Sequence, residues 1–171
     1  TLSPLCYDKG MTEASIELAR AGIPVVVMPM PTTGGTGPAT LAGTVMVNNA
    51  EFLGGLVMQE FASPGAPVVY AAAVGTIDFK TGSNMLSPES GLMYLALSQV
   101  ARYYDLPSEI GVTGETASKV LDAQAGYERA RTILTQISTT PDIALGMGGL
   151  EGDRMTSAEA LVIDNEIIDY A

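Results

Sequence analysis

The sequence contains no histidine, no tryptophan and a single cysteine, Cys6. Without histidine the chain cannot by itself supply a Ser-His-Asp triad, a Cys-His pair, a proximal haem ligand or most kinds of zinc site. One cysteine rules out a disulfide within the chain, and no signal or transit segment opens it, so we expect a cytoplasmic location. Catalysis therefore has to use carboxylates, Lys, Tyr, backbone dipoles or a borrowed cofactor.

Basic residues are also scarce. Eight Lys and Arg stand against 19 Asp and Glu, which gives a formal net charge of -11. Nucleic acids and anionic membranes attract proteins through Lys and Arg, so neither is an expected partner, and cationic or neutral small ligands fit better. We expect no apolar stretch long enough to span a bilayer. The 171 residues, 47% of them hydrophobic, suffice for one domain with a sizeable core.

What the sequence does contain is an alternation of short apolar runs, glycine-rich loops and helix-like stretches. The clear runs are 24–30, 67–74 and 142–147, with a weaker one at 109–113. Runs rich in Val, Ile and Ala and bounded by Pro and Gly are typical of buried strands in a parallel sheet. We expect parallel βα units of an α/β fold, about half of a TIM (β/α)8 barrel, which typically needs about 250 residues. A complete small doubly wound sheet is the alternative.

The start at Thr1, without an initiator Met, suggests that residues 1–171 are one domain, a fragment cut just after an upstream strand. The terminal strands of such a fragment would expose unpaired edges, so we expect a homo-oligomer. Helices are expected between the strands. Their signals are a Thr12 cap, an apolar crossover over 41–61, a cap with first-turn proline at 87–89, a long stretch over 116–138 and a capping box at 156–159.

In a parallel sheet all strand exits face one rim, where barrel enzymes assemble their sites. The exit loops here are 3–8, 31–37, 75–78, 112–114 and 146–151. The glycines of the second loop could cradle a phosphate, but the loop lacks the Gly-Lys-Ser/Thr ending of a P-loop and the spacing of a dinucleotide fingerprint. Ordinary turn glycines are the simpler interpretation.

Three blocks of this sequence resemble the trimethylamine methyltransferase family. They are residues 118–128 (SKVLDAQAGYE), Pro31-Thr32-Thr33-Gly34 and residues 157–167 (SAEALVIDNEI). The resemblance runs through the whole chain and corresponds to the central part of a longer protein. It implies a (β/α)8 barrel that moves a methyl group from a tertiary or quaternary amine to the Co(I) of a separate corrinoid (cobalamin) protein. The corrinoid is then carried by that partner, and none is expected to bind this chain directly.

The resemblance also implies a role for Lys119. Archaeal trimethylamine enzymes of this family carry pyrrolysine near this position, and its absence here favours the branch that acts on quaternary amines such as glycine betaine. Lys119 is therefore the candidate catalytic residue, with a solvated lysine in a first helical turn as the alternative. A quaternary nitrogen already bears its charge, so the site has to hold the cation, orient one methyl group and exclude water. No metal site is expected.

Six further residues are candidate substrate contacts: Tyr7, Thr32, Asp78, Gln124, Met147 and Glu151. Tyr7 offers an aromatic face to a cation, Asp78 and Glu151 offer carboxylates, and Met147 offers a soft apolar wall. Each has a structural alternative: a turn-forming Asp78, a buried Gln124 satisfied by backbone, a core Met147. Glu128 is expected to pair with Arg131 on the surface.

Three functions stay open at this point. The first is a corrinoid-dependent amine methyltransferase, the second a module that binds a cationic osmolyte without turnover, and the third a barrel fragment with no activity of its own.

Overall fold

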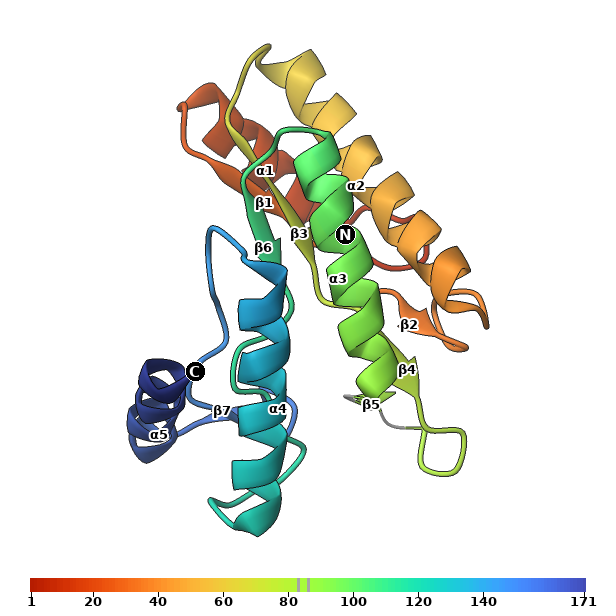
Figure 1. Ribbon diagram of the computed structural model, residues 1–171. Coiled ribbons are helices and arrows are strands. Elements are labelled where there is room, and N and C mark those ends of the chain that lie inside the picture. Colours follow the sequence, from red (N-terminus) through yellow and green to blue (C-terminus); the bar gives the residue numbers. More distant parts are fainter. Residues whose placement is uncertain (83, 86) are drawn as a thin grey trace.

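The computed structural model describes residues 1–82, 84–85 and 87–171, which form a mixed α/β structure (Figure 1). The helices within these ranges are α1 (Lys9–Arg20), α2 (Leu41–Ala62), α3 (Pro88–Tyr103), α4 (Ala123–Thr139) and α5 (Ala158–Tyr170). The strands are β1 (Val25–Val27), β2 (Thr32–Thr33), β3 (Val68–Ala72), β4 (Gly75–Ile77), β5 (Asn84–Met85), β6 (Ser108–Ile110), β7 (Gly149–Leu150) and β8 (Met155–Thr156).

The main sheet is parallel, as the sequence predicts. Its strands lie in the order β1-β3-β6, with α2 joining the first pair and α3 joining the second. Beyond β1 and β3 the chain continues into β2 and β4, which also pair in parallel. The described strands therefore follow one another in sequence order, without the reversal of a doubly wound sheet. Three strands do not close a barrel, so the half-barrel remains a prediction.

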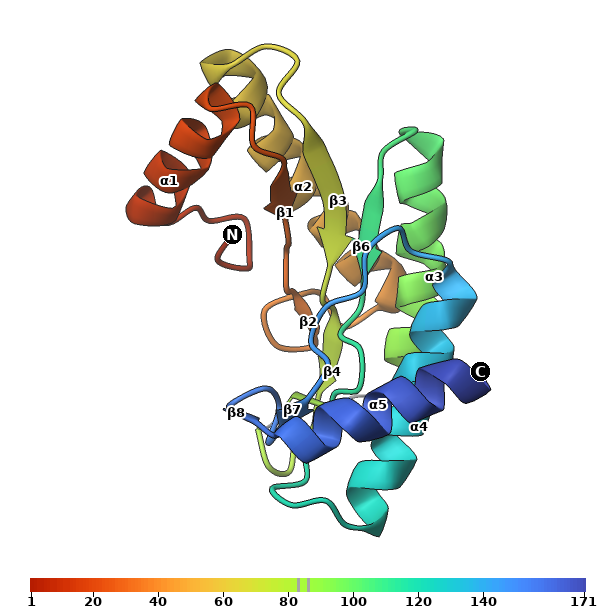
Figure 2. The ribbon, with the colours of Figure 1, turned by 90° about the vertical axis from the view of Figure 1, so that its left-hand side faces the viewer.

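The core lies between one face of this sheet and helices α2 and α3. Phe52 of α2 packs on Tyr70 of β3 with 4.3 Å between ring centroids, and Leu97 of α3 is fully buried in the same cluster. Because side chains alternate along a strand, Val26, Val69, Ala71 and Glu109 point the other way. We call this the second face. In Figure 2, α2 and α3 lie behind the strands, so the view is onto the second face.

The run at 142–147 does not form the expected regular strand. It meets β6 through one parallel bridge, between Ile143 and Glu109, and the Thr113 amide donates to the Leu145 carbonyl at 2.8 Å. The Asp142 carboxylate instead accepts the Ser108 amide at 2.7 Å, and Gly146 and Gly148 adopt φ of 95° and 86°. A side-chain acceptor at one end and left-handed glycines at the other prevent a continuous ladder. We call residues 140–147 the crossing segment, since Figure 2 shows it in front of the sheet.

Three helix starts also differ from the expectation. Helix α4 begins at Ala123 rather than at 116, because Asp122 accepts the Ala125 amide at 2.9 Å as its N-cap. Helix α1 is capped by Asp8 instead of Thr12, and α5 by Ser157, one residue after the start of the predicted capping box. The expected helix at 41–61 and the start at 87–89 are confirmed as α2 and α3.

Two antiparallel pairs, β4 with β5 and β7 with β8, were not expected from the sequence. Each is a local hairpin beyond the carboxyl ends of the parallel strands. The β7–β8 turn contains three successive left-handed residues, Glu151, Gly152 and Asp153. These hairpins extend the rim where the strands end without changing the direction of the main sheet.

The sequence was expected to contain no apolar stretch long enough to span a bilayer. Helix α2 differs from this expectation, because Leu41–Ala62 is long and apolar enough to do so by length and composition. In the structure this helix packs on α1, α3 and the sheet, and it buries the polar side chains of Asn48, Glu51 and Gln59. The core helix of a globular fold passes the same test of length and composition.

Candidate functional site

Two of the predicted site residues, Lys119 and Glu151, form an ion pair. The Lys119 Nζ lies 3.1 Å from Glu151 Oε1, with 73% of the lysine side chain exposed. Lys119 sits in the loop before α4, not in a helical turn, so the expected helical position was wrong. The backbones of the two loops are joined as well, because the Glu151 and Gly152 amides donate to the Ser118 and Thr116 carbonyls at 2.9 and 2.8 Å.

Gln124 supports the same loop from the first turn of α4. Its side-chain amide donates to Glu128 Oε1 at 3.0 Å, and it is exposed rather than buried. The other oxygen of Glu128 accepts the Thr116 hydroxyl at 2.6 Å and the Ala117 amide at 2.8 Å. Glu128 therefore stabilises the loop that carries Lys119. This role differs from the expected surface ion pair with Arg131.

Tyr7 and Thr32 lie elsewhere. The Tyr7 hydroxyl donates to the Glu51 carbonyl, and the side chain lines a cavity of about 260 Å³ between α1, β1 and α2. Burial and the nearby Glu51 carboxylate raise the pKa of Tyr7. The Thr32 carbonyl accepts the Gly35 and Gly37 amides at 2.9 and 2.8 Å, so these amides close a turn. That geometry agrees with turn glycines rather than a phosphate cradle.

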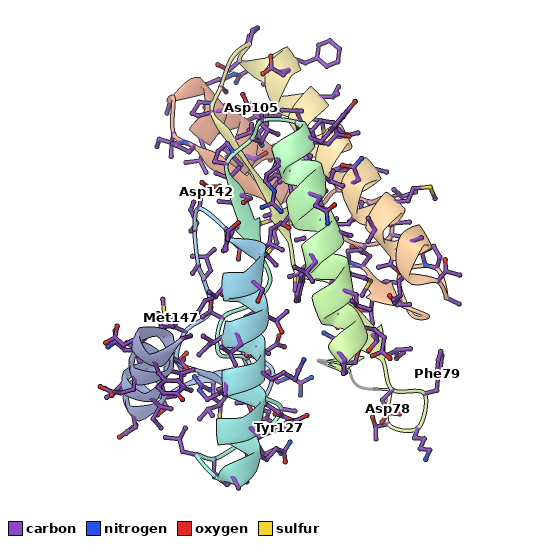
Figure 3. The ribbon with its side chains drawn as sticks, in the orientation of Figure 1. Asp78, Phe79, Asp105, Tyr127, Asp142 and Met147 are labelled. Carbon is purple, nitrogen blue, oxygen red and sulfur yellow. The ribbon has the colours of Figure 1, made fainter. Side chains whose placement is uncertain are left out.

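Asp78 and Met147 are far from each other. Figure 3 shows Asp78 and Phe79 on the loop after β4 at one side of the molecule and Met147 near α5 at the other. Asp78 accepts the Lys80 amide at 2.9 Å and the Thr81 hydroxyl at 2.7 Å, and these bonds lower its pKa. Met147 is 38% exposed on the crossing segment. The structure thus joins Lys119, Glu151 and Gln124. Tyr7, Thr32 and Asp78 make their hydrogen bonds in other parts of the chain, and Met147, on the crossing segment, precedes Glu151.

Sequence reasoning missed Glu109, the most unusual side chain of the sheet. It lies on β6 opposite Ala71, is 0% exposed, and neither carboxylate oxygen has a hydrogen-bond partner among the described residues. Burial raises its pKa to about 8. The available signal was a charged residue at the head of an apolar run that was expected to be buried on both faces.

Two further carboxylates lie near the end of β6, on the loops that follow β6 and β7. Burial raises the pKa of Glu115 to about 7; repulsion by Asp153 adds to this effect and Arg131 opposes it. Burial also raises the pKa of Asp153, against the attraction of Arg129. Tyr94 of α3 experiences the charges of Glu115, Glu109 and Asp153. Glu109 lies on β6 itself, and Glu115 and Asp153 lie on the loops that follow β6 and β7. We call these three carboxylates, which all act on Tyr94, the acidic mouth.

A buried ion pair, also missed, positions the turn that carries Asp153 and Glu151. Arg129 of α4 donates to the two oxygens of Asp164 of α5 at 2.7 and 2.5 Å. The same guanidinium donates to the Gly149 carbonyl at 2.5 Å, and the Gly148 amide donates to Asp164 at 2.7 Å. Both helices therefore hold the start of the β7–β8 hairpin. The described Cys, Asp and Glu side chains form no group of three or more that could hold a metal ion.

Comparison of the sequence with known proteins identifies its family. The family model described as trimethylamine methyltransferase (MTTB) matches residues 1–171. This chain belongs to the trimethylamine methyltransferase family. The resemblance that the sequence blocks carry is thereby confirmed.

Three relatives show how much of the family's length this chain covers. The trimethylamine methyltransferase MttB of Methanosarcina thermophila is 40% identical to it, over 97% of this chain and 34% of the relative. The glycine betaine methyltransferase of Desulfitobacterium hafniense strain Y51 is 38% identical over 98% of this chain and 35% of the relative. A trimethylamine methyltransferase MttB of D. hafniense strain DSM 10664 / DCB-2 is 36% identical over 96% and 33%. The chain spans about a third of the length of these curated relatives.

Proposed function

We propose that this chain forms part of an enzyme that takes a methyl group from a tertiary or quaternary amine. The acidic mouth is the observation that carries the proposal. It consists of three carboxylates, Glu109 on β6 and Glu115 and Asp153 on the loops after β6 and β7, which all act on Tyr94, in a chain of this family. A methylated ammonium is a cation with an apolar surface, and carboxylates in a partly dry setting attract such a cation more strongly than they would in water.

The proposed architecture is about half of a TIM (β/α)8 barrel in a single domain. Two features support it: the described strands run parallel in sequence order, and α2 and α3 cover the same face of the sheet. In a barrel the second face, with Val26, Val69 and Glu109, would line the interior, and the rim would hold the site. Strand β1 pairs only with β3 among the described strands, so its other edge is open to further chain or to a second copy.

Lys119 remains the proposed catalytic residue on the strength of the family resemblance alone. Its ammonium is paired with Glu151, which belongs to the same β7–β8 turn as Asp153 of the acidic mouth. A quaternary substrate suits such a site because the nitrogen needs no covalent activation before it departs as a neutral amine. We therefore favour a quaternary amine, of the glycine betaine kind, over trimethylamine.

The proposed methyl acceptor is a corrinoid bound to a separate partner protein in the cytoplasm. The chain contains no histidine, so it offers no imidazole ligand to cobalt, and a cofactor carried by a partner agrees with that donor set. When bound, the corrinoid supplies a Co(I) nucleophile. The residues of this chain would hold the cation, direct one methyl group outward and keep water away while the carbon–nitrogen bond breaks and its electron pair stays on nitrogen.

A methyl-transfer assay tests the proposal. The full-length protein is mixed with reduced cobalamin or a corrinoid protein and with glycine betaine, choline or trimethylamine in turn, and the absorbance of methylated cobalt is followed. We expect methylation with at least one amine and a slower rate for E115Q/D153N than for the surface control E13Q/E17Q. No methylation with any amine would reject the activity, and binding without transfer would indicate the osmolyte-binding module instead.

A further inference from the structure

The cavity between α1, β1 and α2 takes no part in the proposed methyl transfer. It has a volume of about 260 Å³, and none of Glu109, Glu115 and Asp153 is among its described lining residues. For comparison, an engineered protein cavity of about 150 Å³ with apolar walls binds benzene. The cavity beside α1 is therefore large enough for a molecule of two fused rings.

The walls of this cavity are mostly apolar and come from all three elements. They include Met11 and Leu18 of α1, Val25 and Val27 of β1, Met28 just after β1, and Met58 of α2. The sulfur atoms of methionine make favourable contacts with aromatic rings. Asp8 is the only charged side chain among the described lining residues; it is exposed, and it caps α1 by accepting the Met11 amide at 3.0 Å. The lining thus offers an anion no counter-charge and suits a neutral aromatic molecule.

Gln59 of α2 is the polar side chain that points to a ligand. It lines the cavity and is 2% exposed, and its Oε1 has no hydrogen-bond partner among the described residues. The hydroxyl groups of Thr12 and Ser15, which also line the cavity, already donate to backbone carbonyls of their own segment at 2.8 Å. A buried acceptor without a donor is costly. Gln59 therefore calls for one N–H or O–H group at this wall of the cavity.

Two adjacent glycines of α2 shape the same wall. A Cβ at Gly55 would lie 2.7 Å from Val27 Cγ1, and a Cβ at Gly54 would collide with the Tyr7 hydroxyl. Glycine inside a helix is destabilising relative to alanine, and the close approach of Val27 and Tyr7 explains why two occur here. The Tyr7 hydroxyl also donates to the Glu51 carbonyl. Tyr7 and Val27 are thus fixed as walls, which gives the cavity the preformed shape of a small-molecule site.

We propose that this cavity binds a neutral aromatic molecule, of the size of indole, whose N–H or O–H group donates to Gln59 Oε1. The ring would pack on the methionine and valine side chains of the lining. Because the cavity is already formed, binding requires no segment of the chain to move. A quaternary ammonium is a poor occupant, since it has no hydrogen to donate to Gln59 and would meet only the exposed carboxylate of Asp8.

Two probes of the same shape separate the hydrogen bond from the apolar contacts. Indole and benzofuran differ in having N–H or oxygen at one ring position, so only indole can donate to Gln59. Calorimetric titration of the full-length protein should show at least about tenfold tighter binding of indole. In Q59L, which removes the acceptor and keeps an apolar wall, the preference should fall to within about threefold. The matched control Q99L changes an exposed glutamine of α3 and should keep the wild-type preference.

A second variant tests the place of binding without touching a buried residue. Ala14 is exposed on α1 and lines the cavity, so the larger side chain in A14F should occupy part of the space and weaken the binding of both probes by about tenfold or more. Failure of the wild type to bind indole up to its solubility limit would show that water alone fills the cavity, and would overturn the inference. Equal binding of indole and benzofuran would also overturn it, as would A14F with unchanged affinities. If Q59L does not fold, the wild type and A14F decide.

These outcomes are independent of the proposed activity. The titrations involve neither an amine substrate nor a corrinoid, so a protein that binds indole through Gln59 but never methylates a corrinoid keeps the aromatic site and loses the methyl-transfer proposal. A protein that methylates a corrinoid but does not distinguish indole from benzofuran keeps the activity and loses the aromatic site.

Discussion

Arg129 and Asp164 form a two-point ion pair in which both side chains are shut off from solvent. The pair joins α4 to α5 and also holds the backbone of Gly148 and Gly149. The turn that presents Glu151 and Asp153 therefore depends on two residues that are 35 positions apart in the sequence. Removing either partner leaves the other as an uncompensated buried charge.

For this reason R129M and D164L should each lower the free energy of unfolding by about 3–5 kcal/mol. The double variant R129M/D164L should be more stable than either single variant, since it leaves no lone charge. Urea denaturation followed by circular dichroism measures these changes. The control is R20M, which breaks an exposed pair with Glu17 and should cost less than about 1 kcal/mol. Single-variant losses no larger than that of R20M would contradict the account.

The Lys119–Glu151 pair should contribute little to stability because solvent screens it. We expect K119M and E151Q to change the free energy of unfolding by less than about 1 kcal/mol each, with a coupling energy in the same range. If Lys119 is catalytic, K119M should still lower the rate of corrinoid methylation by about tenfold or more. Equal rates for wild type and K119M would show that Lys119 is not part of the proposed catalytic site.

The start of α4 gives a direct test of its cap. Asp122 accepts the Ala125 amide, so D122A should lower the free energy of unfolding by about 1 kcal/mol, whereas D122N keeps an acceptor and should cost less. Thermal denaturation of the two variants against the wild type provides the comparison. A helix that began at 116 would place Asp122 in its interior, and the two substitutions would then have similar effects.

Glu109 should make stability depend on pH. Its folded pKa of about 8 lies above the unfolded value of 4.5, so the folded state binds its proton more tightly. The stabilising effect of that proton is complete below the unfolded pKa and is lost as the pH rises towards 8. E109Q should therefore gain stability relative to the wild type on going from pH 5 to pH 9. Denaturation curves for both proteins at pH 5, 7 and 9 test this, and a constant difference would show that Glu109 titrates normally.

Much of the fold could be predicted because it depends on local patterns. The Val-rich runs that became β1 and β3 carry their own signal, and Ser87 with Pro88 marks the start of α3. The crossing segment could not be predicted in the same way. Its apolar residues match a strand, but Asp142 bonds to Ser108, which is distant in the sequence, and the glycines bend the chain. The hydrophobicity of the segment was assessed correctly, but hydrogen bonds to residues distant in the sequence prevent a regular strand.

The site was harder to predict for the same physical reason. Lys119 and Glu151 were both singled out, but their pairing depends on backbone bonds between two loops. Asp78 and Glu151 have the same side-chain chemistry, and only the structure shows that one closes a turn and the other meets a lysine. Glu109 was not predicted as a site residue, because an apolar run is identified from its hydrophobic residues and a single charged residue within it does not change that pattern. Whether such a charge is paired is a property of its neighbours in space.

The most direct measurement for the central claim is a crystal structure of the full-length protein with glycine betaine or choline bound. The account predicts that the quaternary nitrogen lies within about 4–6 Å of a carboxylate of the acidic mouth, on the side of the sheet that carries Glu109. A cation seated instead in the cavity beside Tyr7, or on the loop of Asp78, would contradict the claim.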